Sequence, residues 1–426
     1  MKSRNFKIQI SLVILISLLV GYFFGINKVN YEWKNYKPNF QIVNKEPPTG
    51  VIAIDATPFW TVWEKLQTNY YDKSKLDTQK MLNGAITGMV QTLGDPFTIY
   101  LPPVQNNNFK QGLAGQFSGI GAELGMKDKQ IIVIAPLTGS PAEKAGIKPG
   151  DSIMGVDGQS TNGWDLRQAV DKIRGPKGTD VSLTILHKDE NSPKEIKITR
   201  DTITVKSVDG WVKPVDCSNK CQIIDLSKAK ANSGKVAYIR LSQFGDNTNQ
   251  EWLALVNKLN SQIKKDKNVK GLILDLRNNP GGYLTDATFI ASEFINQGLP
   301  VVSQETGIPG DKKTLYASRQ GVFTNIPIVV LINKGSASAS EIVAGALKDS
   351  NRAKLIGETS YGKGTIQEAE DLGQGAGLHI TIAKWLTPKG TWVNGKGLTP
   401  DILVALNPKD SSRDTQLERA IEELLK

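Results

Sequence analysis

The chain has 426 residues, a length that allows roughly two to four domains. Its hydrophobic fraction of 39% and charged fraction of 22% argue against a disordered tail protein, a collagen-like chain and a multi-span membrane protein. Two cysteines are too few for a disulfide scaffold or a cysteine-based structural zinc site, and two histidines leave little room for a multi-histidine metal centre. The net charge of +10 permits contact with nucleic acid or an anionic membrane but requires neither.

Residues 8–27 form an uncharged, mostly apolar stretch of 20 residues, long enough to cross a bilayer core of about 30 Å as a helix. Three basic residues precede it, which suits a cytoplasmic N-terminus, although lysines also follow it. A cleaved signal peptide is the alternative, but this stretch is longer than the usual apolar region and lacks a small-residue cleavage site. We therefore expect a single-pass anchor in the cell membrane, with the rest of the chain outside the cytoplasm. Cleavage would instead give a secreted or periplasmic protein.

Residues 50–105 are expected to form a helical module after a polar, proline-containing spacer. Apolar side chains recur at helical spacing from Phe59 to Leu66 and again from Leu82 to Val90. The sequence Gly94-Asp95-Pro96 has turn chemistry, so the helical pattern ends there.

Residues 106–200 have the pattern of a small β-rich domain, with strands expected at 130–135 and 181–186 and a helix near 164–173. The glycines of residues 119–125 superficially match a dinucleotide-binding fingerprint, which should follow a buried strand and open a helix. Here the motif runs into an expected strand, so we do not interpret it as a nucleotide site.

Residues 201–407 alternate strands with helices, which predicts an α/β layer with parallel pairing. The expected strands are 236–241, 271–276, 328–332 and 380–385, and the expected helices are 252–259 and 340–348. The last segment, residues 408–426, is expected to contain a short charged helix from Asp414 to Leu425. Cys217 and Cys221 lie in a polar insertion, where a small disulfide loop and two free thiols both remain open.

Ser338 is the candidate nucleophile because its segment follows the apolar strand 328–332 and opens a helix. A serine at a strand-to-helix turn can stand exposed above a sheet, and the helix N-terminus favours negative charge nearby. Both features suit a nucleophile whose attack creates an oxyanion. Ser338 and Glu341 also fit a helix-capping box that needs no chemistry, so the motif alone leaves both interpretations open.

Neither histidine is well placed to activate this serine, since His187 lies in the β-rich region and His379 in an expected strand. A lysine can act as the base if burial makes it neutral, because desolvation lowers the pKa of an ammonium group. Lys363 lies between two glycines and could approach another side chain closely; a solvated lysine is the alternative. Residues 357–363 also match the start of a phosphate-binding loop, but Gly364 stands where a Ser or Thr should hold Mg²⁺.

The segment 140–151 and the apolar pattern after it resemble a PDZ domain over about residues 111–188. In that family a glycine-rich loop points backbone N–H groups at a peptide's C-terminal carboxylate, and the peptide adds to the sheet as a strand. The resemblance therefore implies that Gly119, Ile120, Gly121 and Ala122 bind a peptide C-terminus. Core packing is the alternative role for the apolar side chains around this loop.

A wider resemblance follows from residues 335–341 and 357–364, together with 275–282 upstream and 395–401 downstream. These motifs, in this order, resemble the carboxy-terminal processing (tail-specific) serine peptidases over about residues 50–405. The resemblance implies a multi-domain α/β protein with a crotonase-like α/β protease core at 201–407. It would also contain a PDZ-like β-rich domain at 106–200, an N-terminal helical module at 50–105 and one N-terminal transmembrane helix.

At the positions of this sequence that match the family's motifs, the resemblance implies that Ser338 is the nucleophile and Lys363 the general base. It also implies that Gln367 helps to position the lysine. The oxyanion hole would come from the backbone N–H groups of Ala339 and of the Gly281-Gly282 turn. Some relatives also use an acidic residue at the position of Asp349, although a solvated helix end is its simpler role here.

Together with the apolar N-terminal stretch, the resemblance therefore implies a membrane-anchored serine endopeptidase that binds protein C-terminal tails and cleaves peptide bonds through an acyl-enzyme. We expect no metal or cofactor and no nucleic-acid partner, and the resemblance leaves a homo-oligomer open. A non-catalytic PDZ scaffold with a decayed protease core is the main alternative, and the presence of Ser338 and Lys363 argues against it. A crotonase-like acyl-transfer enzyme is a weaker alternative that depends only on the Gly281-Gly282 turn.

Overall fold

The structure is a computed structural model that describes residues 12–18, 22, 29–34, 37–42, 55–137, 139–188, 190–218, 220–225, 227, 234–405 and 413–426. The chain divides into two compact units, Met1–Met81 and Leu82–Lys426.

The first unit contains a short helix over residues 12–18, an antiparallel pair of strands and the helix α2. The strands are β1 (Val29–Lys34) and β2 (Lys37–Ile42), and α2 spans Thr57–Asn69. Most of the predicted membrane span, residues 8–27, lies outside the described residues. Within the described part of the chain, no helix has the length and apolar character needed to cross a bilayer.

The second unit begins in helix α3 (Thr78–Gln91), which carries the apolar spacing predicted for residues 82–90. The turn at Gly94-Asp95-Pro96 follows, and then strand β3 (Ile99–Leu101) and helix α4 (Pro103–Leu113). Thus the turn that ends the helical pattern leads directly into a strand of the larger domain, because β3 pairs with β21 (Ala376–Leu386).

The β-rich region forms an antiparallel sheet in the order β10-β9-β7-β6-β5, so β5 (Ala122–Lys127) is an edge strand. Its core is built from alternate residues of the strands, such as Ile131 with Val133 and Val181 with Leu183, as a two-residue period requires. The other bounds are β4 Gln116–Gly119, β6 Gln130–Pro136, α5 Pro141–Lys144, β7 Ser152–Val156, β8 Gln159–Ser160, α6 Leu166–Ile173, β9 Asp180–Leu186, β10 Lys194–Thr199 and β11 Asp201–Thr204.

A seven-stranded sheet in the order β13-β12-β14-β15-β18-β19-β22 forms the centre of the largest domain, and β14 to β22 pair in parallel as predicted. Its strands are β12 Val208–Asp216, β13 Gln222–Ile223, β14 Lys235–Leu241, β15 Val269–Asp275, β18 Ile328–Ile332, β19 Lys354–Gly357 and β22 Ile402–Leu403. Its helices are α7 Thr248–Lys265, α8 Leu284–Ala291, α9 Ala339–Asp349 and α10 Thr415–Leu425.

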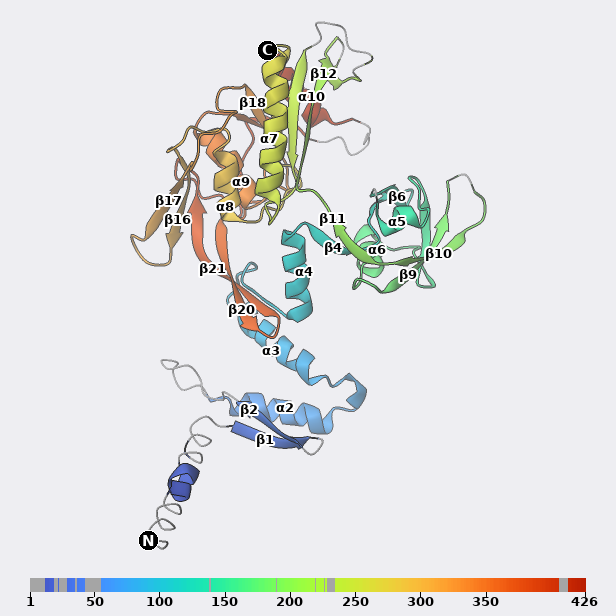
Figure 1. The fold of residues 1–426 in the computed structure, drawn as a ribbon, viewed down its shortest axis with the longest axis vertical. Coiled ribbons are helices and arrows are strands. Elements are labelled where there is room, and N and C mark those ends of the chain that lie inside the picture. The colour runs from blue at the N-terminus through green and yellow to red at the C-terminus, as the bar shows by residue number, and fades with distance from the viewer. Residues whose placement is uncertain are drawn as a thin grey trace, which may run out of the picture. The chain divides into compact units, whose positions relative to one another are not determined.

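Helices cover both faces of this sheet (Figure 1). Ala237 and Ile239 of β14 pack with Trp252 of α7 in the larger core cluster. Val236, from the same strand but the opposite face, packs with Ile421 of α10. The sheet is therefore buried on both sides, which explains why its central strands read as continuous apolar runs.

A second sheet in the order β17-β16-β21-β20 carries the segment that follows Lys363. Its strands are β16 Pro300–Thr306, β17 Lys312–Tyr316, β20 Thr365–Gly373 and β21. Because β20 is a strand, no helix N-terminus receives a phosphate after Gly364, in agreement with the rejection of a phosphate-binding loop. The glycines after Gly119 likewise lead into strand β5 rather than a helix.

Cys217 and Cys221 are joined by a disulfide bond at the end of β12, which decides between the two possibilities left open by the sequence.

Candidate active site

Ser338 lies between β18 and α9, at the turn where the sequence predicts a nucleophile. Its backbone has φ 54° and ψ −116°, a conformation that residues with a side chain seldom adopt. Strain of this kind persists only where surrounding contacts impose it, and it is frequent at functional sites. One backbone group of the upstream loop holds the turn on both sides of Ser338, because Asn279 O accepts hydrogen bonds from Ala337 N at 3.0 Å and from Ser340 Oγ at 2.9 Å.

The fully buried carboxylate of Glu341 joins the turn of Ser338 to the loop of Lys363. Oε2 accepts hydrogen bonds from the backbone N–H of Ser338 and of Lys363, both at 2.9 Å. Oε1 accepts from Ser360 Oγ at 2.6 Å and from Gly362 N at 2.7 Å. Glu341 therefore does more than cap the helix α9, which was the role that the sequence suggested for it.

The main chain at Lys363 is held by two indole groups. Trp385 Nε1 donates to Lys363 O at 2.8 Å, and Trp392 Nε1 donates to Gly364 O at 2.9 Å. Gly364 has no room for a side chain, since a Cβ there would lie 2.7 Å from Trp392 Nε1. These contacts fix the direction in which the lysine side chain leaves the loop.

Burial lowers the pKa of Lys363 below its ordinary value, while the negative charges of Asp95 and Glu341 oppose that shift. The Nζ atom lies 4.9 Å from the centre of the Phe97 ring. His379 is also close enough for the charge of Lys363, after burial, to lower the pKa of its imidazole. Among the described residues, Ser338 Oγ and Lys363 Nζ make no direct hydrogen bond, and such bonds are often long before substrate binds.

Gln367 lies on β20, and its amide nitrogen donates to Thr365 Oγ1 at 2.9 Å and to Thr381 Oγ1 at 3.0 Å. The amide group is thus oriented by two threonines rather than by Lys363, and its role in positioning the lysine stays a prediction.

The Gly281-Gly282 turn lies against the nucleophile. A Cβ on Gly281 would fall 2.8 Å from Ser338 Cβ and 2.9 Å from Ala339 N, so only glycine permits this approach. The N–H of Gly281 donates to Asn279 Oδ1 at 2.9 Å, and it would have to leave this acceptor to bind an oxyanion. Ala339 is the first residue of α9, and helix geometry leaves its N–H without an intrahelical acceptor.

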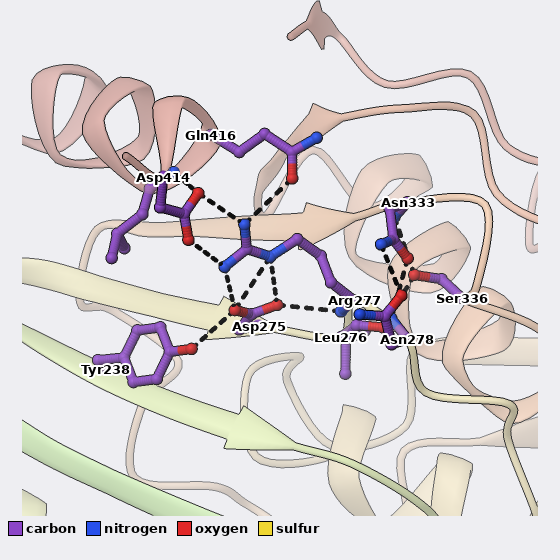
Figure 2. Close-up of polar contacts among 10 residues, drawn as sticks. Tyr238, Asp275, Leu276, Arg277, Asn278, Asn333, Ser336, Asp414 and Gln416 are labelled. Carbon is purple, nitrogen blue, oxygen red and sulfur yellow. Dashed lines mark hydrogen bonds and ion pairs between the residues drawn. The ribbon is translucent and has the colours of Figure 1, made fainter. Parts of the chain in front are cut away.

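The loop that carries these glycines is anchored by Arg277, as Figure 2 shows. The guanidinium group donates to both oxygens of Asp275 and of Asp414, and the bonds to Asp414 are 2.7 Å long. Asp275 is buried and also accepts from Tyr238 Oη at 2.7 Å, while Gln416 Oε1 accepts from Arg277 at 3.1 Å. The last helix, α10, is therefore tied to the strand end that precedes the glycine turn.

A second set of contacts in Figure 2 joins the loops after β15 and β18. Asn333 Oδ1 accepts from Asn278 N at 2.9 Å, and Asn333 Nδ2 donates to Asn278 Oδ1 at 2.8 Å. Ser336 Oγ donates to Leu276 O at 2.8 Å. The glycine turn and the nucleophile turn are thus held together by side-chain amides and a hydroxyl group.

In the β-rich domain, the residues predicted to bind a peptide lie directly before and at the start of edge strand β5. Gly121 has φ 74°, and a Cβ there would lie 2.5 Å from Ser140 Cβ. The side chain of Ile120 is buried, so only its backbone can meet a ligand. Strand β5 pairs with β6 on one side, and helix α6 packs beside it. The other edge of β5 is therefore the place where a peptide could add as a strand.

The sequence analysis identified Ser338, Lys363 and the glycine turn as candidate site residues, but it missed three neighbours of the lysine. The sequence analysis places Asp95 in a turn and His379 in a strand, and it assigns no role in the site to Phe97. No spacing pattern links them to Lys363, because the β3–β21 pairing that places them is a contact between distant parts of the chain.

Three features together define a modular serine hydrolase. They are a strained serine beside a glycine turn, a partly buried lysine, and a separate domain of the kind that binds peptides. The Peptidase family S41 model matches residues 235–404, the PDZ domain model matches 110–186, and the activating protease CtpB N-terminal domain model matches 28–103.

The chain is 37% identical to the carboxy-terminal processing protease CtpB of Bacillus subtilis over 360 residues, which are 84% of this chain and 70% of that protein. It is 40% identical to a probable CtpA-like serine protease of Staphylococcus aureus over 80% of this chain and 63% of that protein. A solved structure of the photosystem II D1 C-terminal processing protease is 29% identical, with a TM-score of 0.51 over 86% of this chain and 97% of that one. The chain therefore belongs to peptidase family S41, as a carboxy-terminal processing serine peptidase with a PDZ domain.

Proposed function

We propose that this peptidase is anchored in the membrane through residues 8–27, acts outside the cytoplasm and cleaves peptide bonds with Ser338 and Lys363 as a catalytic dyad. The observation that carries the dyad is the shared acceptor, since Glu341 Oε2 binds the N–H of both residues. The uncharged stretch of 20 residues near the N-terminus supports the anchor.

In the proposed cycle, the PDZ domain binds the C-terminal carboxylate of a protein through the backbone of residues 119–122, and the tail pairs with β5. Capture of the tail raises the local concentration of the substrate chain at the catalytic domain. The substrate of this site is then an extended, unstructured segment, because a folded segment could not pair as a strand.

Chemistry begins when neutral Lys363 takes the proton of Ser338 Oγ as the serine oxygen attacks the peptide carbonyl carbon. The carbonyl electrons move to the oxygen, and N–H groups of Ala339 and of the glycine turn would stabilise this oxyanion. The ammonium group of Lys363 then protonates the leaving amine. Water later attacks the acyl-enzyme ester, with Lys363 again as the base. Burial of Lys363 supports this role, because it lowers the pKa and enlarges the neutral fraction.

The test uses the full-length chain in a mild detergent with an unstructured reporter protein that ends in an apolar tail. One reporter has a free C-terminal carboxylate, and a matched one has an amidated C-terminus. The proposal predicts that the wild-type chain cleaves the free-carboxylate reporter with a clearly lower KM and that Ser338→Ala cleaves neither. Equal KM values for the two reporters would contradict carboxylate capture, and cleavage by Ser338→Ala would contradict the nucleophile.

A further inference from the structure

The turn before β3 brings an aromatic ring to the general-base lysine. Phe97 and Lys363 are distant in sequence, yet Lys363 Nζ lies over the Phe97 ring at 4.9 Å from its centre. An ammonium group at this distance from a ring face is attracted by the negative face of the ring. A neutral amine in the same place is attracted to the ring much more weakly.

Asp95 holds this turn in shape. Its Oδ1 accepts from Phe97 N at 3.0 Å, and its Oδ2 accepts from Thr98 Oγ1 at 2.6 Å. Thr98 Oγ1 in turn accepts from Thr381 N at 3.0 Å, which fixes the turn to strand β21. Burial raises the pKa of Asp95, but hydrogen bonds from Thr381 and Thr98 outweigh it and leave the pKa below the ordinary value, so the group is ionised at neutral pH.

Three ionisable groups face Lys363 from the elements packed around it: Asp95 from this turn, Glu341 from α9 and His379 from β21. His379 is neutral at neutral pH because burial and the charge of Lys363 lower its pKa. Glu341 already accepts four hydrogen bonds from the two catalytic loops. Asp95 and the ring of Phe97 therefore act together with the charge of Glu341 to stabilise a positive charge on Nζ.

We propose that Phe97 and Asp95 are positioning residues for Lys363, which hold Nζ near the nucleophile turn and stabilise the ammonium ion formed when it takes the proton of Ser338. The inference depends on the proposed dyad. During that step the Oγ–H bond of Ser338 breaks, an N–H bond forms on Lys363 and the serine electron pair bonds to the substrate carbon. The ring face and the carboxylate bind the product of this transfer more strongly than the reactant, so they favour the transition state.

The test compares Phe97→Leu, which keeps apolar volume, with Phe97→Tyr, which keeps the ring, by measuring kcat and KM of the full chain between pH 6 and 10. Loss of a cation–π contact predicts that Phe97→Leu lowers the limiting kcat by roughly 3- to 30-fold, with KM unchanged. Its pH profile should also move to lower pH, because the ammonium form of Lys363 loses stabilisation. Phe97→Tyr should keep both properties near the wild type.

Asp95→Asn is the second variant, and removal of its charge should move the pH profile in the same direction. Phe109→Leu is the matched control, because the Phe109 ring packs against the ring of His379, with 4.3 Å between the ring centres, and not against Lys363. Identical pH profiles and kcat for Phe97→Leu, Asp95→Asn and the wild type would overturn the inference. If instead Lys363→Ala retained activity, the dyad itself would be wrong, so the two failures are distinguishable.

Discussion

The backbone N–H of Ser338 and the carboxylate of Glu341 are joined by a hydrogen bond of 2.9 Å, and the same carboxylate also binds the loop of Lys363. A buried carboxylate with donors from both loops sets the distance between nucleophile and base without touching the substrate. Its negative charge also raises the pKa of Lys363, as that of Asp95 does, and opposes the effect of burial.

Replacement of Glu341 by Gln should therefore lower kcat by about 100-fold or more. The amide presents only one acceptor oxygen to donors that now use two, so one catalytic loop must shift, and a shift of about 1 Å is enough for such a loss. Steady-state kinetics on the reporter would measure the effect. Glu368→Gln, at an exposed position of β20, is the matched control and should retain wild-type kinetics. Equal activity in both variants would show that Glu341 does not set the site geometry.

Activity should rise with pH as Lys363 loses its proton. The protonated lysine cannot accept the proton of Ser338, and burial brings its pKa below the ordinary value near 10.5. The rate should therefore reach its plateau at a lower pH than an exposed lysine would allow. The profile of kcat/KM against pH, with a peptide that does not ionise in this range, would test this. A rate that falls through the same range would contradict a lysine base.

The ion pairs of Arg277 with Asp275 and with Asp414 should contribute unequally to stability. Arg277→Met leaves Asp275, which is 1% exposed, without its cation and should cost about 3–5 kcal/mol of unfolding free energy. Asp414→Asn keeps the Arg277–Asp275 pair and should cost only about 1–2 kcal/mol. Urea unfolding of the two variants would measure the difference. Equal losses in the two variants would place the pair with Asp414, not Asp275, at the centre of this network.

Asp286→Asn should stabilise the protein at alkaline pH. Burial raises the pKa of Asp286 to about 6, and Asp246 adds to the shift. Because the folded-state pKa lies above the unfolded-state value, the neutral form favours folding at low pH, and this advantage is lost as pH rises through about 6. The amide variant should therefore gain about 1–3 kcal/mol at pH 8.

At pH 4 the same variant should behave like the wild type, since Asp286 is then protonated in the folded state. The new amide can also donate to Asn249 Oδ1, which, like Asp286 Oδ2, lacks a partner within the described structure. Thermal unfolding at the two pH values is the measurement. A gain of equal size at both would mean that the amide contact, and not the charge, is responsible.

The sequence predicted the local features of this site well and its long-range features poorly. The strand 328–332, the turn at Ser338 and the helix after it follow from apolar runs and capping residues that lie within a few positions of each other. The parallel order of the central strands follows from the alternation of strands and helices.

The contacts of Phe97 with Lys363 and of Arg277 with Asp414 depend instead on pairings between segments far apart in the chain. The sequence alone suggested only a capping role for Glu341, because a helix-capping residue and a residue that joins two loops have the same position three residues after the serine. Only the position of residues 360–363 against α9 distinguishes them.

The central claim is that Lys363 activates Ser338, and the most direct measurement is the single-turnover rate of acyl-enzyme formation, followed by mass spectrometry of the Ser338 peptide. The account predicts that the wild-type chain becomes acylated at Ser338 and that Lys363→Ala does so at least about 100-fold more slowly at the same pH. Acylation of Ser338 at an equal rate in Lys363→Ala would contradict the dyad.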